Sequence, residues 1–125
     1  MFQESAYTEE QSLIAAVAAQ LSKQYDDQYF LRSTKIDNYP TAFWQEISEG
    51  GYLGLLVDER YGGAGMTTPD LAVFLHNMAK EGLVSYQLNN QILCSDIISS
   101  LGSDKQKDDL LPGLVKGEFW SYADL

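Results

Sequence analysis

His76 and Cys94 are the side chains that could give this sequence acid–base or nucleophilic chemistry, and each residue type occurs once. A histidine activates a serine or cysteine nucleophile when the two lie within hydrogen-bond reach. His76 has no such nucleophile close to it in sequence, which favours a surface histidine or a satisfied core histidine. Cys94 lies among apolar residues, which favours a small buried thiol over a reactive thiolate. Neither residue predicts a catalytic centre.

Metal sites and phosphate cradles need carboxylates or glycines in a defined arrangement. The acidic pairs Asp26-Asp27, Asp58-Glu59 and Asp108-Asp109 are sequence neighbours expected to point in different directions, so a solvated surface explains them. The glycine run Tyr61–Gly65 follows no strand and precedes no lysine in the phosphate-loop pattern, which favours a structural tight turn. A single cysteine excludes an internal disulfide and a cysteine-based zinc site.

Charge and composition limit the partners and the compartment. The 125 residues include 18 acidic and 8 basic side chains, a net charge of −10 that would repel nucleic acid. The longest apolar stretch, residues 13–19, is too short to span a bilayer, and the N-terminus does not resemble a signal peptide. We therefore expect a soluble protein with no nucleic-acid partner and no membrane span. A single cysteine suits a reducing compartment, the cytoplasm or a mitochondrial matrix.

Apolar residues recur at helical spacing along most of the chain. Capping boxes at Thr8–Gln11 and Ser103–Gln106 mark two helix starts, and Pro112 is expected to disturb the last helix. The predicted helices cover about residues 9–30, 41–49, 68–81, 86–101 and 104–116, with an irregular glycine-rich stretch at 52–67. The one segment expected to be extended rather than helical or irregular is a short strand at Phe119–Ala123. The predicted fold is a single all-α domain over residues 1–125, an orthogonal or up-and-down bundle of about five helices.

The residues expected to face the core share the helical spacing of their segments. They are Leu13, Ile14, Val17, Ala18 and Leu21; Phe43, Trp44 and Ile47; Leu71, Phe74, Leu75, Met78 and Ala79; Leu88, Ile92, Leu93, Ile97 and Leu101; and Leu110, Leu111, Leu114 and Val115.

Two stretches carry glycine-centred motifs in a fixed order. The run Gly50–Gly65, GGYLGLLVDERYGGAG, follows a tryptophan-containing helix, and Leu101–Glu118 contains Gly-x-x-x-Gln-Lys, Leu-Pro-x-Leu and Gly-Glu. Together they resemble the N-terminal domain of the acyl-CoA dehydrogenase family. Asp58 departs from the pattern, because the family usually has proline there, and Asn77-Met78-Ala79 replaces the common Glu-Leu-Ala.

The resemblance implies a larger architecture and a reaction. In the family, an N-terminal helical domain is followed by a middle β-domain and a C-terminal helical domain, with FAD and an acyl thioester between them. The implied reaction is α,β-dehydrogenation of an acyl thioester on coenzyme A or a carrier protein. The β-domain and the catalytic glutamate are expected beyond Leu125. This chain alone is therefore expected to be inactive and to retain no FAD, and the intact enzyme is expected to form a homo-oligomer.

The resemblance also implies which residues contact the substrate. The start of the fourth predicted helix lines the acyl pocket in the family, which corresponds here to Tyr86, Asn89, Asn90, Leu93, Cys94 and Ile97. Leu93 and Ile97 could equally be core residues. An amide left unpaired in an apolar pocket costs about 1–3 kcal/mol. Asn89 and Asn90 therefore predict a short, branched or polar acyl group rather than a long alkyl chain.

Two hypotheses of function follow. The chain is the N-terminal part of a flavin-dependent dehydrogenase of acyl thioesters, working with the remaining domains of the same enzyme. The alternative is a stand-alone helical interaction module that keeps this fold without catalysis. Continuation of the reading frame beyond Leu125 would discriminate between them.

Overall fold

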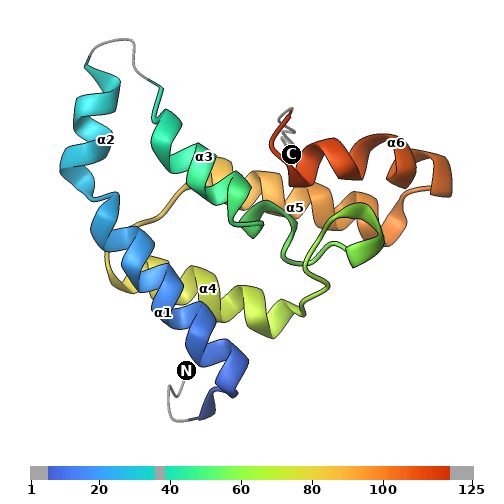
Figure 1. Ribbon diagram of the computed structural model, residues 1–125, viewed down its shortest axis with the longest axis horizontal. Helices are drawn as coiled ribbons and strands as arrows, with labels where there is room; N and C mark the ends of the chain where they lie inside the picture. The colour runs from blue at the N-terminus through green and yellow to red at the C-terminus, as the bar shows by residue number, and fades with distance from the viewer. Residues whose placement is uncertain (1–5, 36–38, 119–125) are drawn as a thin grey trace. The chain divides into compact units, whose positions relative to one another are not determined.

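The computed structural model describes residues 6–35 and 39–118, and every regular element in these ranges is helical (Figure 1). The all-α prediction is confirmed for this part of the chain, and the expected strand at 119–123 lies outside it. The elements are α1 (Glu9–Gln24), α2 (Asp27–Thr34), α3 (Thr41–Glu49), the 3₁₀ turns η2 (Tyr52–Gly54) and η3 (Glu59–Tyr61), α4 (Thr68–Lys80), α5 (Tyr86–Leu101) and α6 (Asp104–Val115).

The helix predicted over residues 9–30 is in fact two helices, so the described ranges contain six α-helices rather than five. Asp26 causes the break. Its side chain accepts a hydrogen bond from the Tyr29 backbone N–H at 3.0 Å and caps the start of α2. A short carboxylate stabilises a new helix start in this way, because the first amides of a helix have no partner within it.

The described chain divides into two compact units. The first unit holds α1, α2 and α4, of which α1 and α4 pack against each other. Ser22 on α1 is buried, and its hydroxyl donates to the carbonyls of Ala18 at 2.9 Å and Met78 at 3.2 Å. The fully buried residues of this pair include Ala18, Leu21, Val73, Phe74 and Met78. Leu13 and Ala79 were expected in this core, but both are exposed because they lie on the sides of α1 and α4 that face solvent.

The second unit holds α3, η2, η3, α5 and α6. Here α6 packs on α5, and both contact η2. Its buried apolar residues include Phe43, Ile47, Leu53, Leu88, Ile92 and Leu114, and a cluster of Val57, Leu111 and Val115 packs with Tyr61 and Ile98. The helix α6 continues through Pro112 to Val115, so the expected disturbance does not end it. Leu110, predicted inward, is partly exposed.

Both predicted capping boxes are confirmed. In the first, the Thr8 hydroxyl accepts from the Gln11 amide at 3.1 Å, and the Gln11 side chain accepts from the Thr8 amide at 3.2 Å. In the second, Ser103 and Gln106 make the same exchange at 3.2 and 2.9 Å. Each box satisfies two amides that a helix start leaves without a partner.

Ser103→Ala is expected to destabilise the protein by about 1 kcal/mol, the usual cost of losing an N-cap side chain. The loss should appear as a lower midpoint of urea denaturation. Ser100→Ala is the matched control, because Ser100 is an exposed residue inside α5, where alanine is a better helix former. Equal losses in the two variants would contradict the assigned cap.

None of the helices within the described ranges has the length and apolar character needed to cross a membrane.

Candidate functional site

All six residues predicted to contact substrate lie on one helix, α5 of the second unit. Ser85 starts this helix, since its hydroxyl accepts a hydrogen bond from the Leu88 amide at 3.2 Å. The helix ends at Leu101, and the Gly102 amide donates to the Ile98 carbonyl at 2.9 Å. Four uninterrupted turns therefore hold the six side chains in a fixed register.

One side of α5 is buried within the chain. Its fully or nearly fully buried residues are Leu88, Gln91, Ile92 and Ser95. Gln91 is completely buried, and its side-chain amide donates to the Leu114 carbonyl at 3.2 Å. This bond satisfies a carbonyl near the end of α6 and links the two helices. Gln91 is a buried structural residue that a pattern of apolar spacing does not predict.

The opposite side of α5 is an exposed apolar stripe. Tyr86 is 67% exposed, Leu93 52%, Ile97 44% and Leu101 82%. Their spacings of seven, four and four residues place them on one helix face. The core assignment of Leu93, Ile97 and Leu101 was therefore wrong within this chain. The reason is that α5 is apolar on most sides, so its periodicity does not tell which face the other helices cover.

The structure separates the six predicted residues into two groups. Tyr86, Leu93 and Ile97 belong to the exposed stripe, and Asn89 is exposed beside it. Asn90 and Cys94 are buried, and the Cys94 thiol donates to the Asn90 side-chain oxygen Oδ1 over 3.7 Å. The expectation that Cys94 is a small buried thiol is thus confirmed. Leu101 extends the stripe and could have been found from its spacing of four residues after Ile97.

The glycine loop of the second unit is a structural turn, as expected. Its amides donate to backbone carbonyls: Gly62 to Glu59 at 3.0 Å, Gly63 to Asp58 at 3.2 Å, Ala64 to Gly54 at 2.9 Å, Gly65 to Val57 at 2.8 Å and Met66 to Leu55 at 2.8 Å. A phosphate cradle needs amides that point outward and remain available. These amides are already used, so this loop is no phosphate site.

The acidic pairs have structural uses. Asp58 accepts from the Arg60 amide at 2.8 Å and caps η3, which accounts for its place in a motif that usually carries proline. Asp108 lies 3.8 Å from the Arg60 guanidinium, and Asp109 accepts from Lys105 at 2.6 Å. Over the ranges that the structure describes, no three histidine, cysteine or acidic side chains are placed to hold a metal ion.

Two side chains in the second unit have shifted pKa values. The hydrogen bond to Asp109, and then its charge, raises the pKa of Lys105. Burial, reinforced by the Glu46 carboxylate, raises the pKa of Tyr52 above its ordinary 10.0. The folded state thus favours the neutral Tyr52 phenol. This contribution to stability is complete below pH 10 and is lost as the pH rises through the folded-state pKa.

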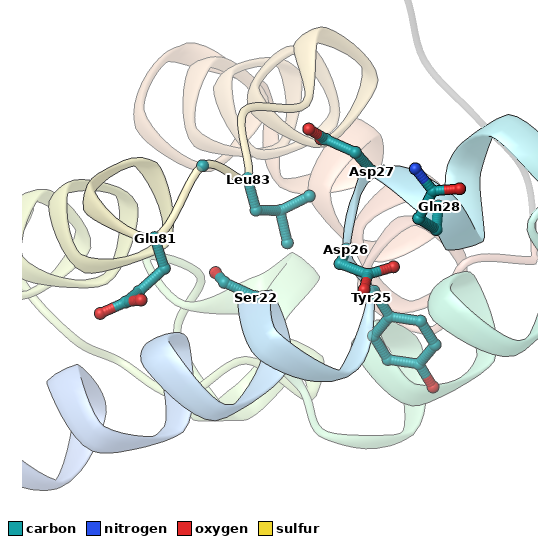
Figure 2. Close-up of a pocket in the computed structure, with 8 residues that line it drawn as sticks. Ser22, Tyr25, Asp26, Asp27, Gln28, Glu81 and Leu83 are labelled. Atoms are coloured by element: carbon teal, nitrogen blue, oxygen red, sulfur yellow. The ribbon is translucent and has the colours of Figure 1, made fainter.

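A hollow of about 330 Å³ lies in the first unit, where α1 meets α2 and α4 ends (Figure 2). Its lining includes Ser22, Tyr25 and Leu83 together with the acidic residues Asp26, Asp27 and Glu81. Its charge does not suit an anionic ligand, and none of the six predicted residues belongs to it. His76 is half-buried on α4 and does not line it either.

Residues 8–118 match the family model for the acyl-CoA dehydrogenase N-terminal domain. An acyl-CoA dehydrogenase of Mycobacterium tuberculosis is 30% identical over 110 residues, which are 87% of this chain and 28% of that protein. The L-prolyl-[peptidyl-carrier protein] dehydrogenase of Pseudomonas fluorescens is 32% identical over 80 residues, 61% of this chain and 21% of that protein. The mitochondrial isobutyryl-CoA dehydrogenase of Dictyostelium discoideum is 23% identical over 112 residues, 89% of this chain and 27% of that protein.

A solved structure concerned with the electron transferring flavoprotein of Acidaminococcus fermentans contains a chain of the same fold. The TM-score is 0.75 at 20% identity, over 94% of this chain and 32% of that chain. The present chain thus spans less than a third of these curated relatives and of the structural neighbour.

Proposed function

Because the chain belongs to the acyl-CoA dehydrogenase family, as its N-terminal domain, we propose that the intact protein dehydrogenates acyl thioesters between their α and β carbons. The thioester is carried by coenzyme A or by a carrier protein. This domain supplies one wall of the acyl pocket, formed by Tyr86, Leu93 and Ile97. The observation that carries the proposal is the exposed apolar stripe of α5.

The stripe has the chemistry of an acyl-binding wall. Scattered exposed apolar side chains are ordinary, but a contiguous row on one helix marks a surface that something covers. Burial of apolar surface contributes about 25 cal/mol per Å², so an alkyl group laid along Leu93 and Ile97 would be bound without any charge. The relatives are more than three times as long as the matched segment, so an intact protein of that length has further residues that could close the pocket.

We propose that the flavin site lies outside the glycine loop described here. The family resemblance implies FAD, whose diphosphate needs available amides or basic side chains, and the amides of the glycine loop are occupied. We therefore assign the flavin, which would accept the hydride, to the remaining domains. The catalytic carboxylate is assigned there as well. The part left to α5 is to orient the acyl chain and exclude water from it.

We propose a short, branched or polar acyl group rather than a long alkyl chain. One relative is named for isobutyryl-CoA, whose acyl group is short and branched, and another is named for a prolyl group on a carrier protein. The stripe also carries the bulky Tyr86 at one end and the polar Asn89 beside it, which do not suit a long straight chain. A homo-oligomer is expected for the intact enzyme by analogy with the family.

The test uses the intact protein, expressed from the full reading frame. We expect a yellow protein whose flavin absorbance bleaches when a short or branched acyl-CoA is added anaerobically. The 125-residue chain alone is expected to be colourless and inactive. A colourless intact protein that binds no acyl thioester would overturn the proposal and favour the non-catalytic helical module. Turnover that is fastest with long straight-chain thioesters would overturn the proposed acyl size.

A further inference from the structure

Asn89 interrupts the apolar surface of α5 with an exposed amide. It lies three residues after Tyr86 and four before Leu93, so it shares their side of the helix. Its backbone amide is bonded to the Ser85 carbonyl at 3.1 Å. Its side chain forms no hydrogen bond with another residue in the ranges 6–35 and 39–118. The Asn89 amide is thus available to a ligand that covers the stripe.

The neighbouring Asn90 differs in its burial. It is 6% exposed, and its side-chain oxygen accepts the Cys94 thiol, so a ligand that covers the stripe meets Asn89 rather than Asn90. By spacing both asparagines share a side of α5 with the stripe, but only Asn89 is exposed there. A role in selecting substrate therefore falls to Asn89.

The pocket that we propose for α5 would remove water from this amide. A buried amide whose hydrogen-bonding capacity is unused disfavours the bound state, and a site built around such a group rejects ligands that lack the complementary group. We propose that Asn89 selects acyl groups that carry a hydrogen-bonding polar group beyond the β carbon, an inference that rests on the proposed dehydrogenase function. A neutral amide, hydroxyl or amine would satisfy it.

A charged side chain near Asn89 further limits the class of acyl group that would bind. Asp96 lies seven residues after Asn89, two turns along the same side of α5, and is half-buried. A carboxylate at the end of the acyl group would be repelled by Asp96, whereas an amide or an amine would not. The selected acyl group is therefore polar and neutral or cationic, and not a dicarboxylic half-ester.

The experiment compares three coenzyme A thioesters of nearly equal shape on the intact protein. They end in an isopropyl group, a primary amide and a carboxylate, namely 5-methylhexanoyl-, glutaramoyl- and glutaryl-CoA. The readout is the second-order rate constant of anaerobic flavin bleaching or, for a thioester that binds without bleaching, its inhibition constant against isobutyryl-CoA. We expect the amide to be preferred over the isopropyl group and over the carboxylate by roughly 10- to 100-fold.

Asn89→Leu should abolish or invert the preference for the amide over the isopropyl group, and Asn89→Gln should retain part of it. Gln20→Leu is the matched control, because Gln20 is an exposed amide on α1 and its loss should leave the ratio unchanged. A wild-type preference for the isopropyl thioester, or an unchanged ratio in Asn89→Leu, would overturn the inference while leaving the dehydrogenase function intact. Failure of every thioester to bleach the flavin would overturn both.

Discussion

Replacing Gly63 with alanine is expected to destabilise the protein by about 3 kcal/mol or more, one of the largest losses available from adding a single carbon atom. A Cβ atom on Gly63 would lie 1.9 Å from the Val57 carbonyl oxygen, 2.4 Å from its carbonyl carbon and 2.6 Å from its Cβ. Two of these three atoms are backbone, so no side-chain rotation relieves the overlap.

The overlap would also break hydrogen bonds. Gly63 and Ala64 donate to Asp58 and Gly54, and Gly65 donates to Val57 itself. To accommodate a methyl group, the loop would have to move away from Val57, which belongs to a buried cluster with Leu111 and Val115. The cost therefore includes lost loop bonds and lost core packing, and it should appear as a lower free energy of unfolding in urea.

Gly65→Ala is the matched control. Gly65 lies in the same loop with a positive φ of 62°, but a Cβ atom there would meet only the Glu59 Cγ at 3.7 Å. Its cost is limited to the left-handed backbone conformation, about 1–2 kcal/mol. If the two variants lost equal stability, the close approach of Gly63 to Val57 would be refuted.

Leu93→Glu is expected to lower kcat/KM of the intact enzyme by roughly 100-fold or more, because a carboxylate in the acyl pocket loses its hydration without gaining a partner. The same change should alter the stability of the 125-residue chain by less than about 0.5 kcal/mol, since Leu93 is 52% exposed there. A large effect on activity with none on folding distinguishes a pocket wall from a core residue.

Leu31→Glu provides the comparison for this prediction. Leu31 lies on α2 and is 51% exposed, so the same change of side chain is made at the same exposure on a different helix. Its kcat/KM should stay within about twofold of the wild type. Equal losses of activity in the two variants, or a large loss of stability in Leu93→Glu, would remove the assigned role of the stripe.

Local chemistry made much of the fold predictable. A serine or threonine with glutamine three residues later is enough to start a helix, and both such motifs start helices here. The turn at Tyr61–Gly65 was predicted from its glycines, and Gly62 and Gly65 do adopt positive φ. The missed break at Asp26 follows the same chemistry. Asp26 is the N-cap of α2, but the helical spacing of apolar residues continues on both sides of it, so the spacing alone does not indicate a break.

The sequence predicts that the candidate site lies on a helix, but it does not predict which face of that helix is exposed. The sequence by itself determined that Tyr86, Leu93 and Ile97 share one face of a helix, because the spacing of residues in a helix is constant. Only the tertiary structure decided that this face is exposed, that Leu101 extends it, and that Asn89 is exposed while Asn90 is buried. The physical reason is that burial depends on which elements contact α5 from elsewhere in the chain. A helix that is apolar on most sides does not encode that choice in its own periodicity.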